Sequence, residues 1–328
     1  MNLELLEHLR CPRSGTCLSL REEQYEGSRV RTGRLVSERT GHSYSIHNFV
    51  PRFVAESNYA DNFGMQWNRF RQTQLDQFSG HPISADRFWK ATGWKPERLA
   101  GQWVLDVGCG AGRFADVALR AGARVIALDF SQAVDACWQN LGSHPNLDVV
   151  QGDVYALPFP NRFFPFVYSL GVLQHTPDVA TAFAAIPRVV APGGRLCVDF
   201  YGKRVGTMFH AKYAVRPLTK RMPPERLFAL LQRVVPVLLR VSQGLGRVPS
   251  LGRVLKRLVP VADYTGILPL DSAQLKEWAL LDTFDMLAPQ YDQPQSEKTV
   301  KQWFEIAGMA EIEILQASHL VGRSRQPS

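Results

Sequence analysis

The sequence has little cysteine, and its cysteines form no pattern. Five of them are scattered over 328 residues without the spacing of a disulfide framework, which favours a reduced, cytoplasmic protein. No apolar run approaches the roughly 18 residues that would span a bilayer. The opening stretch MNLELLEHLRCP has acidic residues where a secretory signal needs Lys or Arg, so we expect no export signal.

Internal repeats and low-complexity segments are also lacking, which excludes a solenoid and wholesale disorder. Hydrophobic residues make up 45% of the chain, enough for a sizeable buried core. The length suggests about two domains.

Negative charge is scarce in one interval. The net charge is +8, and between residues 202 and 262 the only acid is Glu225. The basic residues of this interval are Lys203, Arg204, Lys212, Arg216, Lys220, Arg221, Arg226, Arg233, Arg240, Arg247, Arg253, Lys256 and Arg257. A local basic block describes one surface rather than the whole protein.

Strand and helix patterns alternate from Gly101 onward. WVLDVG, RVIALDF, LDVVQGD, FPFVYSLGV and GGRLCVDFY are predicted as strands, with helical segments between them. Such alternation predicts an α/β fold, a doubly wound and mostly parallel sheet covered on both faces. The strands AEIEILQAS and HLVGRSR at the end are too close together for a crossover helix, so we expect them to be antiparallel.

Composition divides the chain into five segments. Residues 1–56 predict a small β-rich module, and residues 57–100 an aromatic helical lead-in. Residues 101–201 hold the alternating core, residues 202–295 a basic helical insertion, and residues 296–328 a closing helix with two strands.

A glycine-rich turn follows the first core strand, in the stretch VLDVGCGAG. Its residues are Asp106, Gly108, Cys109, Gly110 and Gly112. Glycines at the start of a helix let the backbone approach a ligand. The G-x-G-x-G spacing differs from the nicotinamide fingerprint, and the absence of a following Gly-Lys-Ser/Thr excludes a P-loop.

Two acids end the next two strands. Asp129 follows the turn by about 20 residues, where a carboxylate can accept both ribose hydroxyls of a nucleotide-like ligand. Asp153 ends the third strand, and YSLGVLQHTPD follows the fourth. In a doubly wound sheet these carboxyl ends line one crevice.

The motifs VLDVGCGAGRF, VIALDFS, GDVYALPF, GVLQHTPD and APGG, in this order, resemble those of class I S-adenosylmethionine-dependent methyltransferases of the type 11 group. The resemblance covers about residues 100–201 together with the C-terminal helix and strands. It implies a seven-stranded sheet with an antiparallel last strand and S-adenosylmethionine as the cofactor.

The resemblance also implies roles for residues. The glycine turn would approach the amino-acid part of the cofactor, and Asp129 would hold the ribose. Phe130, next to Asp129, is also expected to bind the cofactor. Asp153 would contact the adenine amine, with Val154 beside it. Leu170 and Gln174 would border the methionine end.

The N-terminal module resembles the zinc-ribbon-like domain of some methyltransferases, without its full cysteine set. Cys11 and Cys17 with His42 or His47 make a poor set for structural zinc, so we expect no metal. In the lead-in, Phe63, Gln66 and Trp67 resemble residues that fold over the cofactor. Alternatively, these side chains pack between the N-terminal module and the sheet.

His175 is the candidate general base, because it follows the fourth strand where the crevice opens. Its alternative role is a structural histidine bonded to backbone. Tyr201, at the end of the fifth strand, is a second residue expected on the acceptor side.

The insertion is expected to form the wall or lid of the acceptor site. Arg226, Arg233 and Arg240 recur every seven residues and so share one helical face. That face could rest on an anionic membrane, bind a phosphorylated lipid-like substrate, or simply be solvated. The acid-rich segment EWALLDTFDMLAPQYDQPQS could contact the acceptor, or it could hold the lid in place.

Three functions compete at this point. The first is methyl transfer to O or C of a small molecule, such as a natural-product, glycan or lipid-linked intermediate. The second is methylation of tRNA or other RNA, although the basic interval is rich in Leu and Val rather than in base-stacking aromatics. The third is a non-catalytic scaffold that binds S-adenosylmethionine. The sequence does not specify the oligomeric state.

Overall fold

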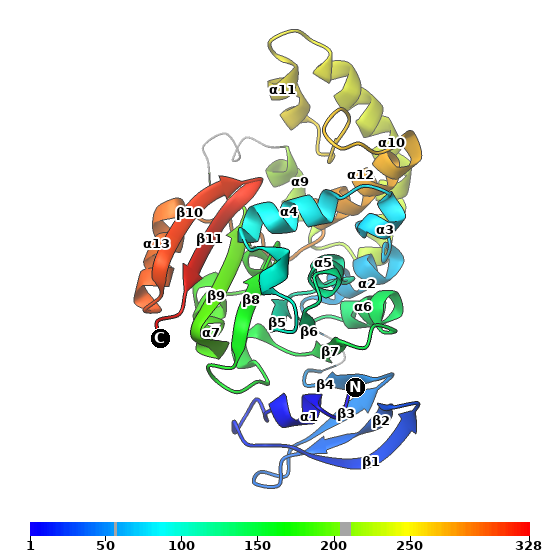
Figure 1. Ribbon diagram of the computed structural model, residues 1–328. Helices are drawn as coiled ribbons and strands as arrows, with labels where there is room; N and C mark the ends of the chain where they lie inside the picture. The colour runs from blue at the N-terminus through cyan, green and yellow to red at the C-terminus, as the bar shows by residue number, and fades with distance from the viewer. Residues whose placement is uncertain (56–57, 204–210) are drawn as a thin grey trace.

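A computed structural model describes residues 1–55, 58–203 and 211–328 (Figure 1). The predicted boundary at residues 56 and 57 lies outside these ranges, as do Arg204 and the side chain of Arg253. Across the described ranges the strands form one eleven-stranded sheet, in the order β1-β2-β3-β4-β7-β6-β5-β8-β9-β11-β10.

The centre of the sheet is parallel, as the alternating pattern predicted. It contains β5 (Trp103–Val107), β6 (Arg124–Asp129), β7 (Leu147–Gln151), β8 (Phe164–Ser169) and β9 (Val190–Phe200). At one edge β11 (His319–Arg325) runs antiparallel to β9, and β10 (Ala310–Ala317) runs antiparallel to β11. The predicted antiparallel ending is therefore confirmed.

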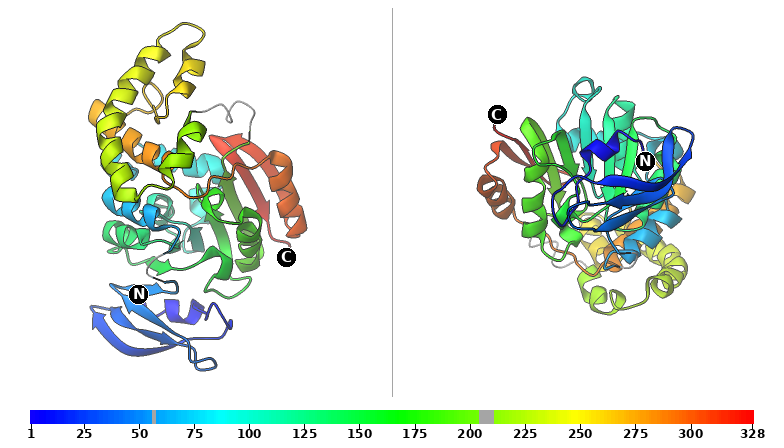
Figure 2. Two further views of the ribbon diagram at one scale, coloured as in Figure 1. Left: turned by 180° about the vertical axis from the view of Figure 1, so that it is seen from behind. Right: turned by 90° about the horizontal axis from the view of Figure 1, so that it is seen from below.

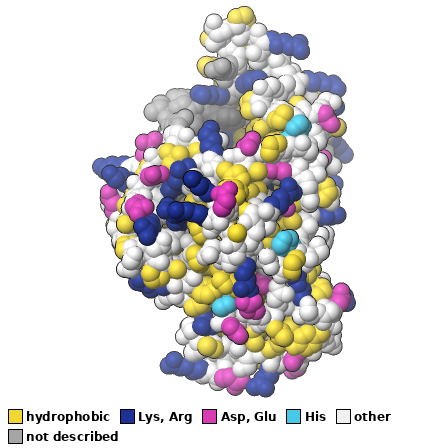
Figure 3. All heavy atoms as spheres, in the orientation of Figure 1, with side chains coloured by type: hydrophobic (Ala, Val, Ile, Leu, Met, Phe, Trp, Pro, Cys, Tyr) yellow, Lys and Arg dark blue, Asp and Glu magenta, His cyan; other side chains and the backbone are white. Residues whose placement is uncertain are grey.

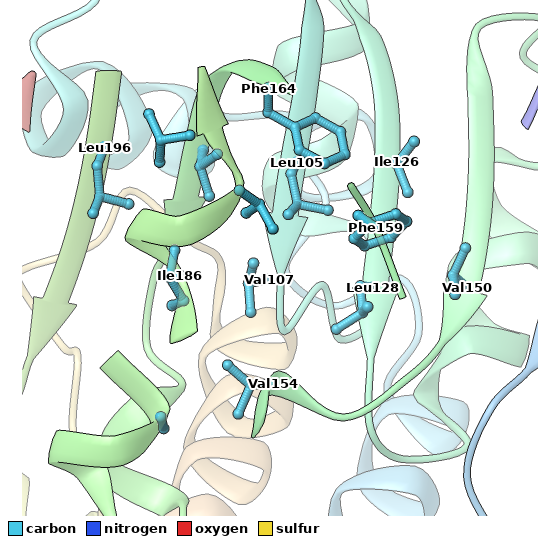
Figure 4. Close-up of a cluster of buried hydrophobic side chains, with 14 of the residues drawn as sticks. Leu105, Val107, Ile126, Leu128, Val150, Val154, Phe159, Phe164, Ile186 and Leu196 are labelled. Atoms are coloured by element: carbon cyan, nitrogen blue, oxygen red, sulfur yellow. The ribbon is translucent and has the colours of Figure 1, made fainter. Parts of the chain in front are cut away.

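Helices cover both faces of this sheet. On one face α4 (Ile83–Thr92), α5 (Arg113–Arg120) and α6 (Ala133–Leu141) pack over a buried cluster. On the other face α7 (Val179–Ala185) and α13 (Glu297–Ile306) pack over a second cluster. Figure 4 shows part of this second cluster, with Leu105, Ile126 and Phe164 pointing into the same layer.

The N-terminal module extends the sheet instead of forming a separate body, which the sequence did not predict. It contains α1 (Leu5–His8), β1 (Ser19–Glu26), β2 (Arg29–Val36), β3 (Ser43–His47) and β4 (Val50–Arg52). β4 pairs in parallel with β7 through Arg52 and Gln151, and the Phe53 N–H donates to the Gln151 carbonyl at 2.8 Å. The seven-stranded core is thus part of an eleven-stranded sheet.

The remaining helices belong to the lead-in and the insertion. The lead-in has α2 (Asp61–Arg69), α3 (Asp76–Ser79), α4 and the 3₁₀ helix η1 (Pro96–Arg98). The insertion has α9 (Lys212–Thr219), α10 (Pro224–Gly246), α11 (Gly252–Leu255), η5 (Lys256–Leu258) and α12 (Ser272–Leu287). Short 3₁₀ turns in the core are η2 (Val154–Ala156), η3 (Leu173–His175) and η4 (Pro187–Val189).

The two ends of the insertion lie side by side where they join the core. The Lys203 N–H donates to the Gln295 carbonyl at 2.8 Å, and the Gln295 N–H donates to the Tyr201 carbonyl at 2.8 Å. Between these residues α10 packs on α12 around Leu231, Val235 and Phe284. The α10–α11 end projects from the molecule opposite the N-terminal module (Figures 1 and 2).

Helix α10 corrects the interpretation that no segment is long and apolar enough to span a bilayer. Among the described residues, α10 is long and apolar enough to cross a membrane by length and composition. The length of consecutive apolar runs did not predict this helix because charged residues interrupt every such run, although the helix as a whole remains apolar. One face of α10 is buried against α12, as a core helix would be.

Candidate functional site

The glycine turn leaves β5 at its carboxyl end and enters α5. Gly108, Gly110 and Gly112 all have positive φ, at +88°, +52° and +91°. At Gly112 an added Cβ would lie 2.6 Å from Leu141 Cδ1, so only glycine lets α5 approach α6 this closely. At Gly110 a Cβ would lie 3.1 Å from the Trp67 indole. The turn therefore forms a narrow cradle beneath an aromatic ring.

Asp129 fixes the turn from the end of the neighbouring strand β6. One carboxylate oxygen accepts the Gly110 N–H at 2.9 Å, and the other accepts the Ser131 N–H at 2.8 Å and hydroxyl at 2.7 Å. Burial raises the pKa of Asp129 above its ordinary value, and these donors oppose that rise. The carboxylate is thus held in a defined orientation beside the glycine cradle.

A cavity of about 1030 Å³ opens over the carboxyl ends of the parallel strands. Ten of the predicted site residues line it: Phe63, Trp67, Gly108, Cys109, Gly110, Asp129, Phe130, Val154, Leu170 and His175. They come from the lead-in, from the turn after β5 and from the ends of β6, β7 and β8. The fold therefore brings together residues more than 100 positions apart. Tyr201 also lines the cavity.

Five predicted residues are not part of this lining: Asp106, Gly112, Gln66, Asp153 and Gln174. Gln66 is buried and donates to Asp285 Oδ1 at 3.3 Å. Asp153 accepts the Tyr155 N–H at 3.0 Å and caps η2. Their predicted contacts with the cofactor stay predictions.

Asp106 and Gln174 are buried polar residues with atoms that lack partners. Asp106 is 1% exposed, and burial raises its pKa to about 8. Asp106 Oδ2 and both amide atoms of Gln174 have no hydrogen-bond partner in the described part of the chain. Buried polar atoms without partners are costly and are common at ligand sites. Asp106 lies in β5, two residues before the first glycine of the turn. Gln174 lies in η3, which follows β8.

His175 has one ring nitrogen engaged and one free. Its Nδ1 lies 3.0 Å from the Tyr291 carbonyl oxygen, which can only accept, so Nδ1 carries the proton. In the neutral ring Nε2 then keeps its lone pair, and it has no partner within the described residues. The ring lies 5.2 Å from that of Phe63 and 5.5 Å from that of Tyr201. His175 thus combines the predicted backbone bond with a nitrogen still available to accept a proton.

Sequence reasoning missed Tyr59. Its ring stacks on Phe130 at 4.9 Å and meets the Tyr291 ring edge-on at 5.8 Å. Tyr59 lines the cavity beside Asp129, and burial raises its pKa above the ordinary value. It lies only four positions before Phe63, so the aromatic lead-in was the signal that could have identified it.

The insertion contributes acids that the sequence reading left without a role. Asp282 accepts the Tyr264 hydroxyl at 2.5 Å and the Trp278 indole N–H at 3.1 Å, and burial raises its pKa to about 6. Asp285 accepts the Tyr201 hydroxyl at 3.3 Å. Both aspartates line the cavity, opposite the sheet.

Two arginines, one from the lead-in and one from the core, also line the cavity. Arg87 forms an ion pair with the buried Asp199 at 2.9 Å. Arg113, directly after the glycine turn, donates to Ser84 and Gln74 and has no carboxylate within ion-pair distance in the described ranges. Burial, together with nearby Arg87, lowers the pKa of Arg113 to about 9. The cavity lining therefore contains charged groups of both signs.

No described residues gather into a cluster of three or more His, Cys, Asp or Glu suited to a metal ion. In the N-terminal module Cys11 Sγ lies 3.3 Å from the Tyr44 hydroxyl, and the two ring nitrogens of His42 lie 2.9 Å from Arg13 and Thr40.

The strand order and the site together define the class of domain. A parallel core that ends in an antiparallel strand, with a glycine cradle and an acid on the next strand, is the architecture of class I S-adenosylmethionine-dependent methyltransferases. Residues 105–198 match the methyltransferase domain family. The chain therefore carries a methyltransferase domain of this class. The family match does not extend to residues 1–56, so the zinc-ribbon-like character of that module stays a prediction.

Curated relatives match the same core. A demethylmenaquinone methyltransferase of Thermobifida fusca is 36% identical over 120 residues, which is 35% of this chain and 51% of the relative. A ubiquinone biosynthesis O-methyltransferase of Azotobacter vinelandii is 40% identical over 130 residues, 38% of this chain and 56% of the relative. The chain thus spans about half the length of these relatives.

Similarity to solved structures is found at low sequence identity. The structure of a putative S-adenosyl-L-methionine-dependent methyltransferase from Methanococcus maripaludis is 15% identical, with a TM-score of 0.46. The alignment covers 84% of this chain and 97% of that one.

Proposed function

We propose that this protein transfers a methyl group from S-adenosylmethionine to a small-molecule acceptor. The observation that carries the proposal is one cavity lined by two groups of residues. The first group, which we call the donor end, contains the glycine cradle, Asp129 and Trp67. The second group, which we call the acceptor end, contains His175, Tyr201 and the acids of the insertion.

The donor end fits S-adenosylmethionine by its chemistry. Asp129 presents a carboxylate to ribose hydroxyls, and Phe130 and Tyr59 offer apolar ring faces beside it. Gly108 and Gly110 let Val172 and Trp67 pack against the turn, because an added Cβ would collide with Val172 at the first position and lie 3.1 Å from Trp67 at the second. The Gln174 amide has no partner within the described residues. When bound, the cofactor supplies an activated methyl group on a sulfonium.

The residues of the chain then have two tasks. The first is to align the acceptor with the donor and exclude water, which can contribute about 7–11 kcal/mol to lowering a barrier when the geometry is right. Trp67, which lies against Gly110, and Phe63, whose ring is 5.2 Å from that of His175, serve this task. The second task is to receive a proton when the acceptor begins protonated.

His175 Nε2 is proposed as that proton acceptor. As the bond between the acceptor and the methyl group forms, the methyl–sulfur bond of the donor breaks and leaves its electron pair on sulfur. The acceptor proton passes to Nε2, and the ring becomes positively charged. The Tyr291 carbonyl, which accepts from Nδ1–H, stabilises the charged ring. The proton leaves to solvent after the methylated product departs.

The acceptor is proposed to be methylated at O or C and to combine polar and apolar parts. Asp282, Asp285 and Tyr201 can hydrogen-bond hydroxyl groups, and Ile267 and Leu268 form an apolar wall. The named activities of the relatives, on demethylmenaquinone and in ubiquinone biosynthesis, support an acceptor of this mixed character. A natural-product or lipid-linked intermediate has both parts.

The experiment is a transfer assay with methyl-labelled S-adenosylmethionine. The purified full chain is incubated with fractionated cell extract, and labelled products are identified by mass spectrometry. We expect label in a small organic-soluble molecule, unaffected by prior ribonuclease treatment. Label in ribonuclease-sensitive material would instead assign an RNA methyltransferase. Binding of the donor without label in any fraction would assign a scaffold.

A further inference from the structure

Exposed apolar side chains concentrate in the insertion. Most of the large apolar side chains that are exposed in the described part of the chain lie between residues 218 and 267. They include Leu258, which is 64% exposed, and Ile267, which is 70% exposed. Exposed apolar side chains gathered on one surface commonly mark an interaction site.

Basic residues share this surface. Exposed arginines follow α10 at positions 226, 233, 240 and 247, and Glu225 is the only acid from residue 211 to 262. The nearest acid beyond this stretch, Asp263, is buried and forms an ion pair with Lys256 at 2.7 Å. In Figure 3 dark-blue and yellow side chains lie together on the projecting α10–α11 end. The surface is therefore positive as well as apolar.

The faces of α10 explain this mixture. With 3.6 residues per turn, Leu227, Leu231 and Val235 fall on one side of the helix, and all three are buried. The opposite side carries two adjacent stripes. One stripe is Arg226, Arg233 and Arg240, and the other is Leu230, Val237 and Val241. We call these six residues together the outer face of α10.

The outer face has the composition of a helix that lies on a membrane rather than across one. Although α10 is long enough to span a bilayer, its inner face packs against α12 and is already occupied by protein. Arginines spaced along the whole helix would each have to enter hydrocarbon if the helix crossed it. A helix parallel to the surface instead places Arg side chains at headgroups and short apolar side chains at the acyl boundary.

We propose that the outer face of α10, together with the exposed apolar residues of α11 and η5, docks the protein on an anionic lipid surface. Charge complementarity supports this partner. A second copy bound by two-fold symmetry through the same face would place arginines against arginines. RNA would favour exposed aromatic side chains, and the exposed ones among the described residues, Tyr25 and Phe78, lie outside this surface.

The position of the cavity gives this docking a consequence. Arg257 of η5 and Ile267 line the cavity, and η5 packs against both α10 and α11. The docked surface would thus lie beside the entrance of the cavity. A membrane-resident molecule with an apolar tail could then enter without crossing bulk water.

The test is vesicle co-sedimentation with the full chain, which needs neither methyl donor nor acceptor. We expect binding to vesicles of phosphatidylcholine mixed with phosphatidylglycerol, and weak or no binding to phosphatidylcholine alone. Raising the salt concentration should weaken the binding because counterions screen the headgroups. The triple variant R226E/R233E/R240E should bind at least a hundredfold more weakly, because each basic residue near an anionic membrane contributes about 1 kcal/mol to binding.

Two matched variants control for folding and for general charge. Arg39→Glu reverses an exposed arginine of the N-terminal module, and Ile306→Asp changes an exposed apolar residue of α13. Both should bind vesicles as the wild type does, whereas V237D/V241D should bind more weakly. Absence of wild-type binding to anionic vesicles would overturn the proposal. So would unchanged binding of the triple variant, or a face buried by self-association in sedimentation analysis. Because donor binding is measured separately, failure here leaves the proposed methyl transfer untouched.

Discussion

At the scale of single residues, the site depends on a few polar atoms whose partners are set by the backbone. Asp129 is fixed by three donors from the chain, and His175 is oriented by one carbonyl. The bond from Nδ1 to Tyr291 leaves Nε2 as the nitrogen that can take a proton. The chain itself therefore sets the orientation of these two side chains.

His175→Gln tests the proposed proton acceptor. We expect kcat to fall about a hundredfold or more, the usual contribution of general base catalysis, with the Kd for S-adenosylmethionine unchanged. Steady-state kinetics and calorimetry with the donor measure the two quantities. His47→Gln, in the N-terminal module, serves as the matched control. Unchanged kcat in the H175Q variant would leave His175 with only a structural role.

Asp106 predicts a dependence of stability on pH. Its pKa is raised to about 8 by burial, so between about pH 4 and pH 8 the folded chain keeps a proton that the unfolded chain has lost. The contribution of Asp106 to the free energy of unfolding therefore falls as pH rises through this window. Asp106→Asn removes the titration, so its Tm relative to wild type should increase from pH 5 to pH 9. A Tm difference that is constant with pH, by calorimetry, would contradict this account.

The residues near the turn could be predicted, and those of the insertion could not. The glycines and Asp129 lie in short motifs whose spacing follows from strand and helix geometry. Asp282 accepts a hydrogen bond from Gln74, and Asp285 accepts one from Gln66. Each pair is separated by about 200 positions of sequence. No local pattern encodes such contacts, so the acid-rich run could be noted but not assigned.

At the scale of elements, the strands and helices of the core lie where the periodicity predicted them. The pattern could not indicate that β4 joins β7, because a single bridge at Arg52 and Gln151 is not visible in hydrophobic alternation. It also could not show which side of α10 faces the protein. Arginine spacing predicts a shared face, but burial of the opposite face depends on α12.

Two neighbouring leucines of α10 test its orientation. Leu231 is 4% exposed and packs toward α12, whereas Leu230 is 45% exposed. Leu231→Ala should cost about 2–5 kcal/mol of local stability, as buried Leu-to-Ala changes do. We expect faster amide hydrogen exchange in α10 and α12 as the readout. Leu230→Ala should change exchange little, within about 0.5 kcal/mol, and equal effects of the two variants would show that the assigned faces are wrong.

At the scale of the whole molecule, the N-terminal module and the core share one sheet and one buried cluster. Leu5, Leu9 and Leu35 of the module belong to the same cluster as Leu105 and Phe164. Asn2 donates to Asp148, and Arg52 forms an ion pair with Asp135 at 2.6 Å. The module therefore depends on the core for its packing.

This continuity predicts cooperative unfolding of the module and the core. Differential scanning calorimetry should show one transition for these two parts, and Arg52→Ala should shift it without splitting it. The ion pair is partly buried, so its removal should lower Tm measurably. A separate low-temperature transition, assigned to residues 1–55 by limited proteolysis, would show that the module folds independently.

The central claim is that the glycine cradle and Asp129 hold S-adenosylmethionine. Isothermal titration calorimetry of the full chain with this cofactor tests it most directly. We predict binding at one site per chain, with Kd raised at least tenfold in the Asp129→Ala variant, a loss of about 1.4 kcal/mol or more. Circular dichroism of the variant checks that it remains folded. No detectable binding to the wild type, or equal affinity in the folded variant, would contradict the claim.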